Sequence, residues 1–171
     1  IDGTMASMAD LISFRMVEVV THVTLLPLGL YQSTSNFTVS QATWDSLSVD
    51  DRAAMARAAN RANADFTDRW GRTMPMEAEA AAREAGIEII EADASLVEAL
   101  EAFVEADRAS AAELSIANFG IEDAAERVDH FMELYAKWEA IAEELDNDAA
   151  AMAARVNEEV WAHVDYATYG Q

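Results

Sequence analysis

The fold is decided by residues 48–70, which read SVDDRAAMARAANRANADFTDRW. Ser48 with an acid at Asp51 is a capping-box pattern, typical of the start of a helix. Behind this start, side chains that can share one helix face recur at helical spacing; they are Met55, Ala59, Ala62, Phe66 and Trp70. The stretch therefore predicts a long helix, and we expect Gly71 and Pro75 to end or kink it.

The composition of the chain changes where this helix begins. Val, Leu, Thr, Ser and Tyr are common before it, whereas Ala, Glu, Asp and Arg dominate after it. The first part is therefore expected to hold strands with one helix, and the second to be mainly helical. The elements expected in the first part are a helix at 5–14 and strands at 17–26 and 30–40.

Capping signals divide the acidic part of the chain. A helix at 76–84 should end at Gly86 in left-handed conformation, before a short buried strand at 87–90. Ser95 and Glu98 form another capping box, and the helix behind it carries four apolar residues expected to be buried: Leu96, Leu100, Phe103 and Val104. A further helix should begin near Asp123, and Asn147 should cap the last one.

The charge of the chain limits its partners. Asp and Glu number 32 against 11 Lys and Arg, giving a formal net charge of -21, and Lys137 is the only lysine. Such a surface repels phosphate backbones and anionic lipid, which argues against nucleic-acid binding and membrane docking. No apolar run approaches the roughly 18 residues of a membrane span, so direct insertion is not expected. An acidic, lysine-poor surface would also suit a salty environment.

The sequence carries no recognisable enzyme motif. Cysteine is absent, which excludes disulfides and thiolate sites. His22, His130 and His163 lie far apart and in no metal-ligand spacing. The many paired acids on Ala-rich helices are expected to be solvated, because general acid–base catalysis needs a carboxylate with a shifted pKa. We therefore expect no catalytic residue, no metal ligand and no cofactor.

Five segments, taken in order over about residues 1–105, carry a family resemblance. They are Ile1-Asp2-Gly3, Phe14-Arg15-Met16-Val17-Glu18-Val19, Ser40-Gln41-Ala42-Thr43-Trp44-Asp45-Ser46-Leu47-Ser48, Asp50-Asp51-Arg52 and Ala85-Gly86-Ile87-Glu88-Ile89-Ile90. Together they resemble the solute-binding proteins of TRAP transporters. Two positions depart from the family pattern: Ser40 stands where the family usually has Asn, and Ser48 where it usually has Pro.

The resemblance implies a fold and an organisation. The chain is similar to the C-terminal half of a two-lobe, periplasmic-binding-protein-like (type II) α/β fold that is rich in helices and has few strands. Residues 1–47 would be a strand-containing lobe and hinge segment. Residues 48–171 would hold a long helix that spans both lobes, a short strand and C-terminal helices. Because the chain opens on Ile1 and shows no signal peptide, we expect a fragment of a longer, periplasmic protein.

The resemblance also implies a site. In the family an arginine upstream of the Asp-Gly step grips the ligand carboxylate, since its planar fork matches two oxygens. Many members place a ligand-binding Asn three residues after the Gly, where this chain has Ala6. The expected ligand contacts are therefore Thr4 and Met5 beside that step, and Tyr31 and Gln32 at the start of the second expected strand.

The resemblance predicts a non-enzymatic component of a TRAP-type transporter. It would capture a small organic acid, a mono- or dicarboxylate, and dock on membrane permease subunits. Two alternatives remain open from the residues alone. One is a stand-alone acidic helical protein whose stripes at 55–70 and 128–145 pair with partner helices. The other, weaker one is a small hydrolase that uses a carboxylate pair.

Overall fold

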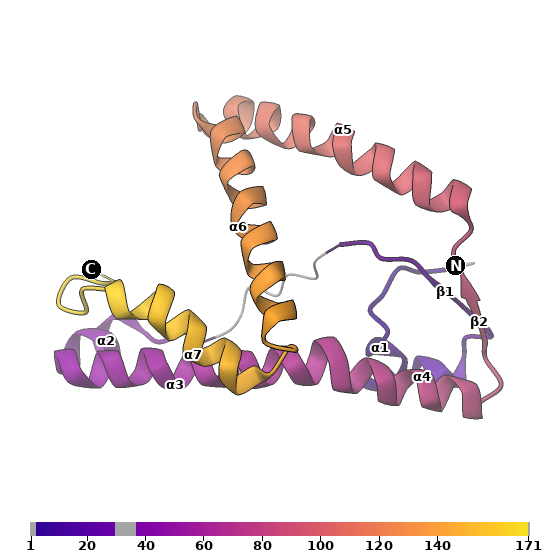
Figure 1. Cartoon of the computed structure of the whole chain (residues 1–171), viewed down its shortest axis with the longest axis horizontal. Helices are drawn as coiled ribbons and strands as arrows, with labels where there is room; N and C mark the ends of the chain where they lie inside the picture. The colour runs from indigo at the N-terminus through magenta and orange to yellow at the C-terminus, as the bar shows by residue number, and fades with distance from the viewer. Residues whose placement is uncertain (1–2, 30–36, 171) are drawn as a thin grey trace.

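The computed structural model describes residues 3–29 and 37–170, and one long helical rod organises it. The rod consists of α3 (Val49–Asp68), the π-helical turn η2 (Arg69–Thr73) and α4 (Met74–Glu84), and it follows the long axis of the molecule (Figure 1). At its start the Ser48 hydroxyl accepts from the Asp51 N–H at 3.1 Å and donates to the Asp51 carboxylate at 2.7 Å. The predicted cap is confirmed.

The rod continues past both residues that were expected to end it. Gly71 lies inside η2, and Pro75 lies at the start of α4. Proline has no N–H and its ring collides with the carbonyl of an ordinary α-helical ladder. Pro75 lies in the first turn of α4, directly after the π turn, and proline is tolerated in the first turn of a helix. The sequence predicted an end or a kink at these residues: the rod does not end there, and its regular α-helical structure is interrupted by the π turn.

A small parallel sheet lies beside α4. It pairs β1 (His22–Leu25) with β2 (Glu88–Glu91), with His22 opposite Glu88. One face of the sheet packs with α1 (Asp10–Ser13) and α4 around a core of Leu11, Ala78, Ala82 and Ile87. The structure is thus mostly helical with two described strands, in keeping with the expected helix-rich α/β class. Gly86 has φ 74° and closes α4 as predicted.

The elements expected before residue 48 are shorter than the sequence suggested. The helix at 5–14 is reduced to α1, and the strand at 17–26 is divided into the 3-10 turn η1 (Met16–Glu18) and the four-residue β1. Arg15 has φ 56°, a left-handed conformation that turns the chain between α1 and η1. Residues 37–40 form no strand, and the rest of the strand expected at 30–40 lies outside the described residues.

Three helices follow the sheet. They are α5 (Ala94–Phe119), α6 (Ala124–Glu144) and α7 (Ala149–Glu159). Figure 1 shows that α5 leads away from β2, that α6 returns towards α3, and that α7 then lies along α3. Asp93 caps α5 and Asp148 caps α7, each accepting a backbone N–H, so the expected caps at Ser95 and Asn147 were misplaced by one or two residues.

Three of the four apolar residues expected to be buried on α5 are exposed, and only Leu100 is half-buried. Phe103 is 64% exposed and Phe119 is 77% exposed, and Leu96 and Val104 also face solvent. The periodicity of a helix indicates which residues share a face, but burial requires a second element against that face. Within the described part of the chain, Leu96 borders the hollow beside β1, and Phe103 and Val104 have no element over them that buries them.

The C-terminal segment is fastened to the beginning of the rod. Short helix α2 (Gln41–Ser46) carries Trp44, whose indole N–H donates to the Tyr169 carbonyl at 2.8 Å. Arg52 is 6% exposed and donates to the carbonyl oxygens of Trp44 at 3.0 Å, Asp45 at 3.3 Å and Tyr166 at 3.3 Å. Its guanidinium also lies 5.5 Å from the centre of the Trp44 ring. One buried cation therefore holds α2, α3 and the tail together.

Candidate ligand-binding site

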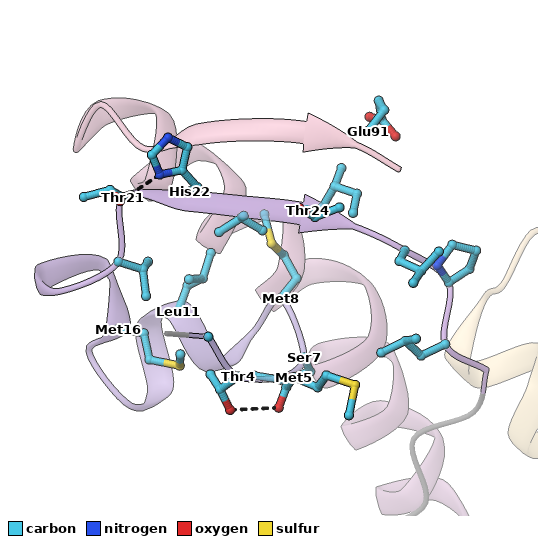
Figure 2. Close-up of a pocket in the computed structure, with 18 of the residues that line it drawn as sticks. Thr4, Met5, Ser7, Met8, Leu11, Met16, Thr21, His22, Thr24 and Glu91 are labelled. Atoms are coloured by element: carbon cyan, nitrogen blue, oxygen red, sulfur yellow. Dashed lines mark hydrogen bonds between the residues drawn. The ribbon is translucent and has the colours of Figure 1, made fainter. Parts of the chain in front are cut away.

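A hollow of about 1130 Å³ lies between residues 3–8 and strand β1. Figure 2 shows the strand on one side, the segment with Thr4, Met5 and Ser7 opposite it, and Met8 and Leu11 between the two. Glu91, at the end of β2, borders the hollow at the far end of the strands. The site is thus built mainly from the segment before α1, from β1 and its flanks and from the end of β2, with Leu11, Met16 and Leu96 added by α1, η1 and α5.

The wall of this hollow is mainly apolar. Of the twenty described residues that line it, fourteen are Gly, Ala, Pro, Val, Leu or Met. The remaining six carry polar groups: Thr4, Ser7, Thr21, His22, Thr24 and Glu91. Lysine and arginine are absent from the described lining. A solute in the hollow would therefore be held mainly by apolar contact and shape, and less by charge.

Two of the four residues expected to contact a ligand lie on this hollow. Thr4 is exposed, and its hydroxyl lies 3.5 Å from the neighbouring carbonyl oxygen of Met5. The Met5 side chain is 83% exposed at the rim. Tyr31 and Gln32 lie outside the described residues. The structure brings Thr4 and Met5 to one hollow, while their contact with a ligand remains a prediction.

Ser7 is a candidate that the sequence analysis missed. Its hydroxyl oxygen is buried and has no hydrogen-bond partner among the described residues. Its N–H donates to the Asp10 carboxylate at 2.9 Å, while the Asp10 N–H bonds the Ser7 carbonyl oxygen at 3.0 Å. Ser7 and Asp10 stand at capping-box spacing, and that signal was available in the sequence. Because the backbone carbonyl replaces the hydroxyl as acceptor, the hydroxyl is left for another partner.

His22 is the one base in the described lining, and both of its ring nitrogens are engaged. Nδ1 lies 2.8 Å from the Thr21 hydroxyl, and Nε2 lies 3.4 Å from the Glu88 carboxylate on the neighbouring strand. A protonated His22 would therefore form an ion pair with Glu88. The ring therefore lies between the two strands, with a protein partner beside each of its nitrogens.

Neither a metal centre nor a membrane-spanning helix is found in the part of the chain that the structure describes. Over residues 3–29 and 37–170, no three or more His, Asp or Glu side chains are grouped closely enough to hold a metal ion. The helices in the same ranges are too short or too polar to cross a bilayer.

Comparison with known proteins gives one match. Residues 1–114 fit the family model described as bacterial extracellular solute-binding protein, family 7. That range is 114 of 171 residues, and it contains the rod, the sheet, every described residue of the hollow and most of α5. No curated protein and no solved structure matches the chain.

Proposed function

The chain belongs to the family 7 bacterial extracellular solute-binding proteins, the solute-binding components of TRAP transporters, and from this premise we propose that it captures a small organic acid for uptake. Proteins of this family are non-enzymatic transport components of the extracellular or periplasmic space. Membership implies a solute ligand and membrane permease partners. The identity of the solute as a carboxylate is the part that we propose.

The hollow beside β1 is the observation that supports this proposal and indicates which residues would contact the solute. It lies wholly within the residues that match the family. It combines an apolar wall with two hydroxyls: that of Ser7, which is buried and has no partner among residues 3–29 and 37–170, and that of Thr4, which is exposed. Solute sites typically have this composition, because apolar contact supplies affinity and a few polar groups fix orientation. Thr4, Met5 and Ser7 are therefore our proposed contacts.

A two-lobe organisation belongs to the same proposal. Residues 1–47 would form a lobe and hinge segment, and residues 48–171 the spanning helix, the short strand and the C-terminal helices. The length of the rod supports this: its 36 residues from Val49 to Glu84 extend about 54 Å at 1.5 Å per residue. When the two lobes close on a solute, their outer faces would together form the surface that docks on the permease.

Thermal-shift and calorimetric titration with mono- and dicarboxylates and sugar acids tests the proposal. A true ligand at one hundred times its dissociation constant adds about 2.7 kcal/mol, which for a chain of this size raises the melting temperature by about 5–10 °C. Thr4→Val should weaken binding about three- to tenfold, and Thr168→Val, in the exposed tail, should leave it unchanged. The proposal would be refuted if no monocarboxylate, dicarboxylate or sugar acid gave a thermal shift or a heat of binding.

One observation favours a second function, that of an acidic helical interaction protein. The apolar side chains along α5 are exposed, including Phe103 and Phe119, and exposed apolar stripes often mark contact surfaces. This alternative predicts ligand-free association that grows with protein concentration. Sedimentation velocity on the wild type and on Phe103→Gln would test it, and a monomer at every concentration would rule it out.

A further inference from the structure

We propose that the solute is a monocarboxylate with an apolar chain or ring, and that the hollow beside β1 holds this apolar body. The inference rests on the proposed function and narrows it to one class of acid. It sets such solutes apart from dicarboxylates and from hydroxyl-rich sugar acids. The chemistry of the described lining supplies the argument.

The first step concerns the apolar wall. Met5, Met8 and Met16 contribute three unbranched thioether side chains to the hollow, next to the Val and Leu residues of β1 and its flanks. Methionine adapts its shape to irregular apolar partners. A methylene chain or an aromatic ring would remove this surface from water, whereas a chain of hydroxyl groups would lose its own hydration against it.

The second step concerns charge. A dicarboxylate carries two anions, and each must find a cation or several donors when it is buried. The described lining has neither Lys nor Arg, and His22 is engaged by Thr21 and Glu88. Glu91 adds a negative charge at the far end of the hollow. A second carboxylate placed along β1 would therefore be unpaired and would approach a like charge.

The third step concerns the number of polar contacts available. The Thr21 hydroxyl is bonded to His22, the Ser7 hydroxyl is buried without a partner in the described part of the chain, and Thr4 and Thr24 add two exposed hydroxyls. These few hydroxyls can serve a keto or hydroxyl substituent on a mainly apolar acid. They are fewer than the partners that the several hydroxyl groups of a sugar acid would need.

Calorimetry on the full chain with a graded series of acids tests this class. The probes are butyrate, hexanoate, octanoate and phenylacetate, against succinate, malate and gluconate. Each added methylene should lower the dissociation constant about three- to fourfold, as expected for burial of a CH₂ group. Succinate, malate and gluconate should bind at least about tenfold more weakly than hexanoate.

A pair of variants ties the preference to this hollow. Met5 is 83% exposed, so Met5→Gln leaves the core intact and should weaken hexanoate binding about three- to tenfold. Met76→Gln is the matched control, because Met76 is 66% exposed on α4 and does not line the hollow. The control should bind hexanoate as the wild type does.

Each outcome decides something. A graded series that Met5→Gln weakens and Met76→Gln does not would support the inference. Succinate, malate or gluconate binding as tightly as hexanoate would overturn the inference and leave the proposed function standing. Affinity that does not change with chain length, or a gradient that Met5→Gln leaves untouched, would also overturn it. No binding by any of the seven acids would overturn the inference and contradict the proposed function.

Discussion

Replacement of the buried cation at the base of the rod is the sharpest test of the packing described above. Arg52→Met keeps the length of the side chain and removes its donors. Arg52 is 6% exposed and supplies three carbonyl oxygens with hydrogen bonds, of 3.0 Å to Trp44 and 3.3 Å to Asp45 and Tyr166. The substitution leaves all three oxygens without this donor in a site that water reaches poorly.

The size of the effect can be worked from these contacts. Hydrogen bonds to a charged group contribute about 1.5–3 kcal/mol each, and the two 3.3 Å bonds belong at or below the low end of that range. Methionine offsets part of the loss, since the burial of the guanidinium no longer opposes folding. We expect a net destabilisation of about 3 kcal/mol, equivalent to a fall in melting temperature of about 6–12 °C for a chain of this length.

Urea unfolding followed by circular dichroism would measure this loss as a lower midpoint with an unchanged slope. Arg61→Met is the matched control: Arg61 lies on the same helix but forms an exposed pair with Asp65, so its midpoint should not move. Arg52→Lys should recover only part of the loss, because an ammonium lacks the planar fork that reaches three separate carbonyls. Equal midpoints for Arg52→Met and Arg61→Met would refute the reasoning.

Three further predictions concern the charge and backbone of the chain. Hydrogen bonds from the Ser95 hydroxyl and the Leu96 N–H lower the pKa of Asp93, so its stabilising effect is present above the ordinary aspartate pKa of about 3.9 and is lost as pH falls below it. Wild type should therefore lose more stability than Asp93→Asn in acid, and parallel curves of urea midpoint against pH would contradict this. The net charge of -21 predicts that 1 M KCl raises the urea midpoint relative to 0.05 M by screening self-repulsion, and a lower midpoint would show that ion pairs matter more. Gly120 has φ 68° and open space around it, so Gly120→Ala should destabilise by about 1 kcal/mol through backbone strain alone, whereas Gly71→Ala, in the helical rod, should stabilise by about 0.5 kcal/mol; equilibrium unfolding that shows the same sign for both would be inconsistent with this view.

The features that the sequence predicted well are local ones. The Ser48 cap and the left-handed turn at Gly86 depend on a few neighbouring residues, and both were found where expected. Strand length could not be read in the same way. A strand extends only as far as its partner, and β2 stops at Glu91 because Asp93 already caps the next helix. The strand expected at 17–26 therefore has only four paired residues.

The exposed stripe of α5 and the candidate site show what the sequence could not predict, namely which elements pack against each other. Periodicity correctly grouped Leu96, Phe103 and Val104 on a helix, but it carried no information about which element, if any, covers them. Thr4 and Met5 were reached through the family resemblance and do lie on the hollow. Ser7 was missed, because a backbone carbonyl takes over the capping bond and leaves the hydroxyl without a partner in the part of the chain that the structure describes.

The π turn in the rod also sets the angle between the face of α3 that holds α7 and the face of α4 that holds the sheet. Asn60 and Ala78 are both buried and are eighteen residues apart, which equals five whole turns of an α-helix. In an uninterrupted helix they would point the same way. Here the Asn60 side chain donates a hydrogen bond to Ala153 of α7, whereas Ala78 packs in the core formed with the sheet and α1. The extra residue in η2 offsets the two faces by about 100°, the angular step of one residue. Deleting a single residue there would therefore rotate the sheet and its hollow about the rod, relative to α7, by about that angle.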